Sequence, residues 1–119
     1  MAGTLLLVDD DELILLSLGD LFSREGYEVR TAANGREALA LAAETGFDVV
    51  VLDVVMPGMS GLDVCRALRA AEGYAAVPIV LLTAKSTPAD EAKGLAAGAT
   101  RFLPKPFDPK RLVEIVREL

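Results

Sequence analysis

Short apolar runs separated by amphipathic stretches follow one another along the whole chain. Unbroken apolar runs rich in Val, Leu and Ile predict strands buried on both faces at 4–8, 49–53 and 77–82. Residues 27–32 alternate between apolar and polar side chains, which is typical of an exposed or edge strand. A short fifth strand is expected at 101–103. The pattern therefore predicts five strands, three of them fully buried.

The stretches between and after these strands predict five helices. Asn34 and Ser60 are the expected caps of the second and third helices, and Pro88 and Pro109 open the fourth and fifth. The fourth helix has a thin face interrupted by Gly94, so we expect it to be the least firmly held. The second helix, over 36–44, is rich in Ala and Leu. The apolar faces expected on the other helices are, in chain order, Ile14, Leu18, Leu21 and Phe22; Leu62, Cys65 and Leu68; Ala89, Ala92, Leu95 and Ala96; and Leu112, Ile115, Val116 and Leu119.

Strand and helix predictions alternate five times, which is the pattern of an α/β fold with a parallel sheet and helices on both faces. The chain has 119 residues, 52% of them hydrophobic, which is enough for one domain around a single core. No linker, low-complexity segment or tandem repeat divides it. We therefore expect one domain over residues 1–119.

The composition narrows the function classes. A net charge of −6 argues against direct nucleic-acid binding, since phosphate backbones need a basic face. No apolar run approaches the roughly 20 residues of a membrane span, and the first residues lack the basic segment of a secretory signal. Cys65 is the single cysteine, which rules out an internal disulfide and fits core packing in a reducing compartment. The expected location is cytoplasmic.

Polar residues follow four of the predicted strands. Asp9 and Asp10 follow the first, Asp53 ends the third, Thr83 follows the fourth and Lys105 the fifth. Carboxyl ends of parallel strands share one edge, where open α/β sheets place their chemistry, so we expect these five residues to meet. Each alone is common at the end of a strand, and the prediction depends on all five together.

Three carboxylates at one edge need a counter-charge. Two of them about 4 Å apart repel by roughly 4 kcal/mol at an effective dielectric constant of about 20. The chain has no histidine, so the available ligands are oxygens, which favours Mg²⁺ over zinc. With the ion, the Lys105 ammonium and the Thr83 hydroxyl would stabilise charge on a phosphoryl group moving onto a nucleophilic carboxylate.

The motifs stand in a specific order. They are Val8-Asp9-Asp10; Asp53 with Met56-Pro57 and Gly61; Thr83-Ala84; and Gly98-Ala99 through Phe102 to Lys105-Pro106-Phe107. In this order, and over the whole chain, they resemble the receiver domain of two-component response regulators, the CheY-like family. The resemblance implies a flavodoxin-like (βα)5 fold, a three-layer α/β/α sandwich around a parallel five-stranded sheet of order 2-1-3-4-5.

The resemblance implies a signalling switch. Asp53 would accept a phosphoryl group from a histidine kinase or a histidine phosphotransfer protein, with Mg²⁺ held by Asp9, Asp10, Asp53 and the backbone carbonyl of Val55. The shift of the fourth helix, fifth strand and fifth helix would then control an output partner or output domain. The chain would catalyse only its own phosphorylation and dephosphorylation and would turn over no external metabolite.

Further roles follow from the same resemblance. Lys105, Thr83 and the backbone of Ala84 would stabilise the phosphoryl group. Thr83 would also be the switch hydroxyl, and Phe102 the switch aromatic that turns inward when the threonine moves. The family has a cis peptide bond at the position of Lys105-Pro106.

Two departures from the family pattern affect the expected hydrolysis of the aspartyl phosphate and the expected dimerisation. Val55 and Lys85 occupy positions that help set how fast the aspartyl phosphate hydrolyses, and because Val55 cannot orient a water we expect slow autodephosphorylation. Thr100-Arg101 stands where transcription-factor receivers often have acids that pair across a dimer. A homodimer held by such pairs is therefore not expected, whereas another homodimer stays open.

Two other function classes compete with the switch. A phosphatase of the haloacid dehalogenase type has a second Asp two residues after its nucleophile, where this chain has Val55. A flavodoxin-like binding module would be favoured by a Gly-rich phosphate loop, but neither G-x-x-x-x-G-K nor G-x-G-x-x-G is present. The phosphorylation switch is therefore the favoured prediction.

Overall fold

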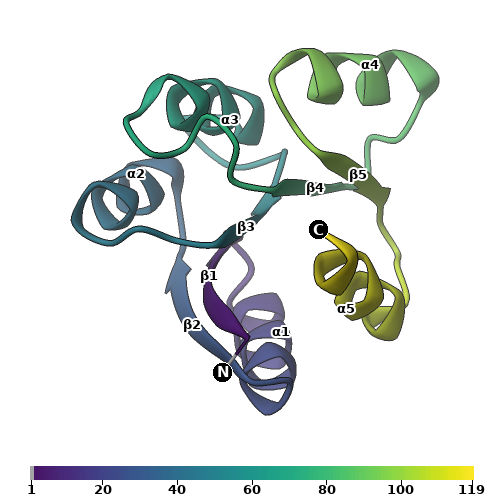
Figure 1. Cartoon of the computed structure of the whole chain (residues 1–119). Coiled ribbons are helices and arrows are strands. Elements are labelled where there is room, and N and C mark those ends of the chain that lie inside the picture. Colours follow the sequence, from purple (N-terminus) through teal and green to yellow (C-terminus); the bar gives the residue numbers. More distant parts are fainter. Residues whose placement is uncertain (1) are drawn as a thin grey trace.

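A parallel five-stranded sheet lies at the centre of the structure, a computed structural model that describes residues 2–119 (Figure 1). The strand order is β2-β1-β3-β4-β5, which confirms the predicted α/β class and topology. The elements are β1 (Gly3–Val8), α1 (Glu12–Arg24), β2 (Tyr27–Ala32), α2 (Gly35–Glu44), β3 (Val49–Asp53), α3 (Gly61–Ala70), β4 (Ile79–Thr83), α4 (Pro88–Ala96), β5 (Arg101–Pro104) and α5 (Pro109–Glu118). The second strand lies at an edge, as expected.

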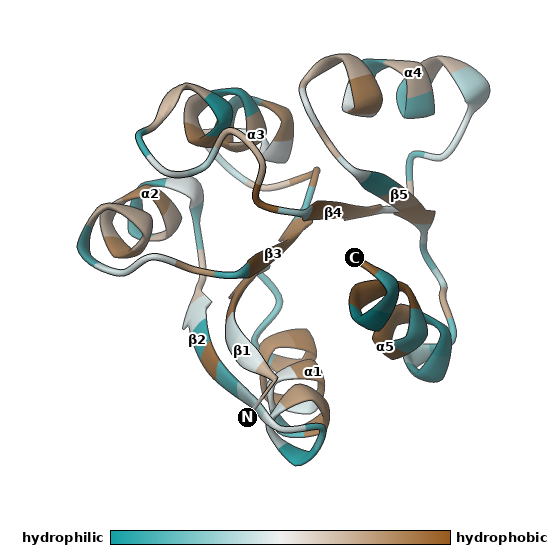
Figure 2. Ribbon diagram, viewed as in Figure 1, coloured by the Kyte–Doolittle hydropathy of each residue, from teal (hydrophilic) through white to brown (hydrophobic). Residues whose placement is uncertain are grey.

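Helices cover both faces of the sheet. Figure 1 shows α1 and α5 on one face and α2, α3 and α4 on the other. Successive side chains of a strand point to opposite faces, so β1 places Leu5 and Leu7 against α1 and α5, and Leu6 and Val8 against the other helices. Every residue of β3 and β4 is buried, and both strands are strongly hydrophobic in Figure 2. The two hydrophobic clusters fix the sheet from both sides.

Side-chain caps begin all five helices. Asn34 accepts a hydrogen bond from the Glu37 N–H and Ser60 from the Asp63 N–H, which confirms both predicted caps. Pro88 and Pro109 occupy the first turns of α4 and α5, also as predicted. The remaining caps are Asp11, Thr87 and Asp108. Because these caps satisfy N–H groups that have no partner within the helix, they fix where each helix starts after its strand.

The fourth strand begins later than predicted. It spans Ile79–Thr83, whereas the apolar run suggested 77–82. Pro78 precedes the strand and has no N–H to donate to a neighbour, although its carbonyl accepts from the Val50 N–H at 3.0 Å. Thr83 is consequently the last residue of β4 rather than the first residue after it.

The predicted apolar face of α4 is wrong. The structure exposes all of its residues: Ala89, Ala92, Leu95 and Ala96. Of the nine residues of α4, all described, Gly94 alone is buried. A Cβ at Gly94 would lie 3.0 Å from the Phe102 ring and 3.1 Å from a Leu81 methyl group. The helix therefore packs on the sheet through its backbone at Gly94, which leaves the Ala and Leu side chains outside.

The last helix confirms most of its predicted face. Leu112, Ile115 and Val116 are buried together with Val113. Leu119, however, is 40% exposed. It follows the final helical residue and caps α5 through its N–H, so it no longer follows the helical periodicity. Across the described part of the chain, no helix is long and apolar enough to cross a membrane.

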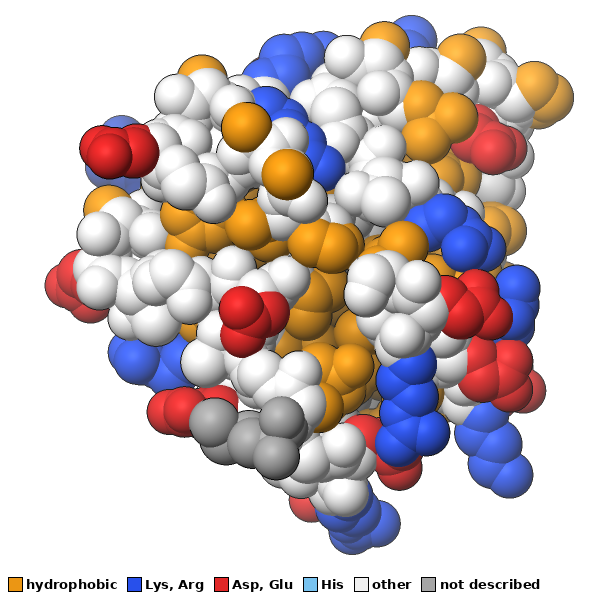
Figure 3. Space-filling view, viewed as in Figure 1, with side chains coloured by type: hydrophobic (Ala, Val, Ile, Leu, Met, Phe, Trp, Pro, Cys, Tyr) orange, Lys and Arg blue, Asp and Glu red, His pale blue; other side chains and the backbone are white. Residues whose placement is uncertain are grey.

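Few charged side chains lie at the middle of the amino end of the sheet. Figure 3 shows hydrophobic side chains in the middle of the face seen there, with most charged side chains around its periphery. A small hollow of about 80 Å³ at this end is lined by Ala2, Tyr27, Asp48, Val49, Pro78, Val116 and Leu119. Asp48 is its single charged lining residue, and it already accepts hydrogen bonds from Thr4. The polar chemistry of the sheet therefore lies at the opposite, carboxyl end.

Gly61 allows α3 to start directly against the end of β3. Its N–H donates to the Val54 carbonyl at 2.8 Å. A Cβ at this position would lie 2.1 Å from the Asp53 carbonyl oxygen and 2.7 Å from the Val54 Cα. Because these are backbone atoms, they cannot rotate away, and any side chain would displace the segment that follows Asp53.

Gly61→Ala should therefore lower the free energy of unfolding by at least about 2 kcal/mol, as overpacking against a fixed backbone does. Chemical denaturation measures the effect. Gly46→Ala is the matched control, since no atom lies within 4 Å of its Cβ position, and it should change stability by less than about 0.5 kcal/mol. Equal losses in the two variants would contradict the argument.

Candidate functional site

Three carboxylates meet at the carboxyl end of the sheet. Asp9, Asp10 and Asp53 each offer a carboxylate oxygen, and these atoms lie within 4.8 Å of one another. In the register of β1 and β3, Val8 stands opposite Leu52, so the residues that follow come out side by side. Asp9 and Asp53 are only 1% and 5% exposed, whereas Asp10 is at the surface. Two acids are thus removed from water while the third faces it.

Lys105 places its ammonium between the two buried acids. Its Nζ lies 3.1 Å from Asp9 Oδ2 and 3.6 Å from Asp53 Oδ1. The Lys105 backbone N–H donates to the Thr83 carbonyl at 2.8 Å, which fixes the start of the side chain beside β4. The Lys105–Pro106 peptide bond is cis. Asp9 also accepts from the Asp11 N–H at 2.9 Å, so its two oxygens are bound by two different segments.

Burial raises the pKa of the Asp53 carboxyl, because charge is poorly solvated there. The negative charge of Asp9 raises this pKa further, and Asp10 contributes a smaller repulsion. The Lys105 ammonium opposes these effects, as does the Val55 N–H, which donates to Asp53 Oδ1 at 3.4 Å. The acid cluster therefore carries more negative charge than Lys105 neutralises. This excess of negative charge favours the binding of a cation.

Thr83 stands beside this cluster. It is fully buried at the end of β4, and its Oγ1 accepts a hydrogen bond from the Lys85 N–H at 3.0 Å. Ala84 and Lys85 are exposed, and so is Val55, which is 50% exposed. A hollow of about 260 Å³ next to Thr83 is lined by Val54, Val55, Met56, Ser60, Leu62, Thr83, Lys85, Asp90, Lys93 and Phe102. The structure thus brings the predicted tuning positions to the rim of the same hollow.

Phe102 is half-buried on β5 and packs against Gly94 of α4. It pairs in register with Leu81, two residues before Thr83 along β4. Phe102 and Thr83 therefore line one hollow from two neighbouring strands. A change in either side chain alters the space available to the other.

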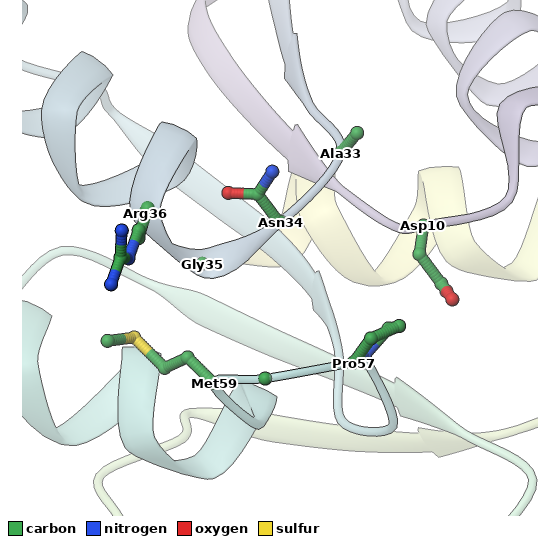
Figure 4. Close-up of a pocket in the computed structure, with 8 residues that line it drawn as sticks. Asp10, Ala33, Asn34, Gly35, Arg36, Pro57 and Met59 are labelled. Carbon is green, nitrogen blue, oxygen red and sulfur yellow. The ribbon is translucent and has the colours of Figure 1, made fainter.

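A second hollow lies on the far side of Asp10. It has a volume of about 740 Å³ and is lined by Asp10, Ala33, Asn34, Gly35, Arg36, Pro57, Gly58 and Met59 (Figure 4). Figure 4 shows that these residues come from the turn into α2 and from the loop after β3, with Asp10 at the border. Asp9, Asp53 and Lys105 do not line it. This hollow is therefore a neighbour of the acid cluster rather than the cluster itself.

Sequence reasoning missed the exposed leucines of α1. Leu13 and Leu16 are 75% and 70% exposed, although both lie in an apolar stretch. Beside them, Ile14, Ser17, Leu18, Ala84, Lys105, Pro106, Phe107 and Pro109 line a shallow hollow. The helical period of α1 places both leucines on its outer face, and a helical wheel could have identified them as exposed.

The sequence matches the response regulator receiver domain family over residues 5–117. The chain belongs to this family. Receiver domains function in phosphorylation-dependent signalling, and the chain is accordingly a signalling protein and not a metabolic enzyme. The family generally binds Mg²⁺ at an acidic pocket, works with kinases or phosphotransfer proteins and acts on output domains.

Relatives and solved structures agree with this assignment. The receiver domain is 44% identical over 117 residues to the DNA-binding response regulator MtrA of Mycobacterium tuberculosis, covering 98% of this chain and 50% of MtrA. It is 45% identical over 119 residues to the response regulator MprA of Mycolicibacterium vanbaalenii, covering 100% of this chain and 51% of MprA. The chain thus spans about half the length of these curated relatives.

Among solved structures, the chemotaxis protein CheY4 of Vibrio cholerae matches the receiver domain with a TM-score of 0.93 at 40% identity, over 98% of this chain and 97% of CheY4. A CheY-like receiver domain protein from Methanospirillum hungatei matches with a TM-score of 0.90 at 30% identity, over 97% and 90% of the two chains. The flavodoxin-like fold expected from the sequence is confirmed.

Replacing Asp53 by Asn should stabilise the metal-free protein at neutral pH. Because the pKa of Asp53 is raised, its charged form opposes folding, and this penalty disappears as the pH falls through the folded-state pKa. We expect the free energy of unfolding to rise by about 1–2 kcal/mol at neutral pH. This rise is smaller than the full repulsion between two carboxylates, because the Lys105 ammonium offsets part of that repulsion. The gain should shrink in acid.

Chemical denaturation at several pH values measures this gain. Asp20→Asn is the control, since Asp20 is exposed and its ion pair is with Arg24 one turn away, and it should shift stability by less than about 0.5 kcal/mol at any pH. A destabilised Asp53→Asn at neutral pH would show that the carboxylate is well compensated, contrary to this electrostatic description.

Proposed function

We propose that residues 1–119 form one receiver domain in which Asp53 accepts a phosphoryl group in an Mg²⁺-dependent reaction. The donor would be the phosphohistidine of a histidine kinase or of a histidine phosphotransfer protein. The observation that supports this most directly is the convergence of Asp9, Asp10, Asp53 and Lys105 from three strand ends.

The donor set fits a hard divalent cation. Asp9, Asp10 and Asp53 supply carboxylate oxygens, the Val55 carbonyl is a further ligand by family resemblance, and the cluster contains no nitrogen or sulfur ligand. Bound there, Mg²⁺ would neutralise part of the acid charge and polarise the phosphoryl oxygens. Burial and the negative charges of Asp9 and Asp10 raise the pKa of Asp53, and an added cation would offset both effects, which supports this assignment.

The protein groups have distinct parts in the transfer. An Asp53 carboxylate oxygen attacks phosphorus, the new P–O bond replaces the P–N bond, and the histidine nitrogen leaves with the electron pair. Lys105 already lies 3.6 Å from Asp53, so its ammonium is placed to pair with the charge of the transferred group. The Thr83 hydroxyl and the Ala84 backbone complete the set of stabilising groups.

The switch would follow from a change of partner at Thr83. Its Oγ1 now accepts from the Lys85 N–H, and a phosphoryl group on Asp53 offers it a stronger, charged acceptor. Movement of Thr83 toward Asp53 frees space in the hollow that Phe102 lines, so the ring can turn inward. The altered surface of α4, β5 and α5 would then act on the output partner or domain.

Two surfaces suit two partners. Leu13 and Leu16 stand exposed beside the hollow that contains Lys105, which is where a donor protein must approach to reach Asp53.

On the output side, Arg101 lies 3.8 Å from Glu118 of the same chain, so it already has an acid nearby. Thr100 and Arg101 supply no acid for an ion pair with a second chain, which supports the prediction that a dimer held by such acids does not form.

Acetyl phosphate tests the proposed function without a partner protein. Intact mass spectrometry should detect one phosphoryl group per chain in the presence of Mg²⁺ and none after chelation of divalent ions. Asp53→Asn should lose the adduct, because an amide is not a nucleophile here, whereas Asp20→Asn should keep it. A folded wild-type protein without any adduct, or an adduct that persists in Asp53→Asn, would contradict the proposal.

Val55→Asn should shorten the lifetime of the phosphoryl group. Val55 is exposed at the rim of the site and cannot orient a water, whereas an amide can, so we expect loss at least about threefold faster. Decay of the adduct mass after removal of the donor measures the lifetime. Leu95→Asn makes a similar apolar-to-amide change on exposed α4 and should leave the lifetime unchanged. An equal lifetime in wild type and Val55→Asn would refute this role of Val55.

A further inference from the structure

One arginine fastens the C-terminal end of α4. Arg69 lies near the end of α3, and its Nε donates to the Gly98 carbonyl at 2.8 Å. One terminal nitrogen donates to the Tyr74 carbonyl at 2.9 Å and also to the Val77 carbonyl. The other donates to Thr100 Oγ1 at 3.2 Å. A single side chain therefore joins the loop before β4 to the turn between α4 and β5.

All three guanidinium nitrogens of Arg69 donate hydrogen bonds in these contacts. Arg69 is half-buried, and none of the ion pairs found among residues 2–119 includes it, so its partners are neutral oxygens. Hydrogen bonds from a charged donor are stronger than neutral ones, and the planar fork sets their directions. The stem lies on the glycine as well, since a Cβ at Gly98 would be 2.6 Å from Arg69 Cγ. Gly98 has a φ of +109°, which also favours glycine.

The same turn is tied to the sheet. The Thr100 N–H donates to the Ile79 carbonyl at 2.8 Å, and the Ile79 N–H donates to Thr100 Oγ1 at 3.0 Å. Thr100 thus bonds to both the first residue of β4 and Arg69. One turn earlier, Gly94 rests on Leu81 and Phe102. The C-terminal half of α4 is therefore held at two successive points.

The N-terminal half of α4 lacks such attachments. Residues 84–89 are all exposed. The capping box joins Thr87 and Asp90 to each other and not to the sheet or to α3. Four residues, 84–87, join Thr83 to this end of the helix, so it is the part of α4 that a change at Thr83 reaches first.

We propose that Arg69 is a positioning residue that makes α4 pivot about its C-terminal end during the switch. The inference rests on the proposed phosphorylation of Asp53 and adds how the change is directed. Displacement at Thr83 moves the N-terminal half of α4, while the segment from Gly98 to Thr100 stays fixed. Without the arginine, the same displacement would spread through the turn into β5.

Hydrogen exchange at single amides, followed by NMR, tests the pivot in the wild-type protein. The Glu91 N–H, bonded to the Thr87 carbonyl, reports on the start of α4, and the Gly98 and Thr100 N–H groups report on the clamp. With Mg²⁺ and excess acetyl phosphate, exchange at Glu91 should change by at least about tenfold, and exchange at the other two by less than about twofold. Intact mass on the same sample verifies the adduct.

Arg69→Gln and Arg66→Gln form a matched pair on α3. Arg66 is exposed and forms its ion pair with Asp63 of its own helix, so its variant should behave as wild type. In Arg69→Gln, phosphorylation should change exchange at Gly98 and Thr100 by about tenfold or more as well, because the clamp is lost. The wild-type measurement needs no substitution, so it can overturn the pivot even if Arg69→Gln does not fold.

The outcomes separate this inference from the proposed function. Equal changes at Glu91, Gly98 and Thr100 in phosphorylated wild type would overturn the pivot and leave the switch intact. An adduct without any change along α4 would overturn the switch and the pivot together. A pattern in Arg69→Gln that is indistinguishable from Arg66→Gln would show that the arginine does not direct the movement.

Discussion

The charge balance between Asp9, Asp53 and Lys105 is the interaction on which the site depends. Two nearly inaccessible carboxylates share one ammonium, with a third carboxylate within reach at the surface. Burying uncompensated charge is costly, and such a group normally takes up a proton or acquires a partner. Burial first, and then the negative charge of Asp9, raise the pKa of Asp53. A site in this state favours any ligand that adds positive charge near the acids.

The sheet holds these groups at fixed separations. Asp9 and Asp53 follow paired residues of β1 and β3, and Lys105 hydrogen-bonds through its N–H to the end of β4. Gly61 lets α3 start in close contact with the backbone of Asp53 and Val54, where a Cβ would not fit. The chemistry is therefore built on a rigid edge, whereas the neighbouring start of α4 is exposed. This contrast between a fixed site and the loosely attached start of α4 is what a switch requires.

Much of this arrangement could be predicted from the sequence. The apolar runs and their flanking acids determine the topology, and the topology brings Asp9, Asp10, Asp53, Thr83 and Lys105 to one edge. The apolar face of α4 could not be predicted, because the helix packs through the backbone of Gly94, which has no side chain to enter a periodic pattern. Hydrophobic periodicity finds faces that bury side chains and misses close backbone approach.

Arg69 could not be identified either. In the sequence it is one of several charged residues on an amphipathic helix, and its partners Gly98 and Thr100 lie 29 and 31 residues away. Tyr74 is similar, since its hydroxyl donates to the carbonyl groups of Ala42 and Thr45 from a loop with no regular pattern. Side chains that bind distant backbone carbonyls leave no periodic signal, and the three-dimensional structure is needed to find them.

Titration calorimetry with Mg²⁺ tests most directly whether the acid cluster is a metal site. We expect one ion per chain, with affinity at least about tenfold weaker in Asp10→Asn, which removes a charged ligand. Asp11→Asn is the control, because Asp11 caps α1 and Asn caps a helix equally well. Its affinity should equal that of wild type. A folded wild-type protein that binds no Mg²⁺, or that binds it as tightly after Asp10→Asn, would contradict the account.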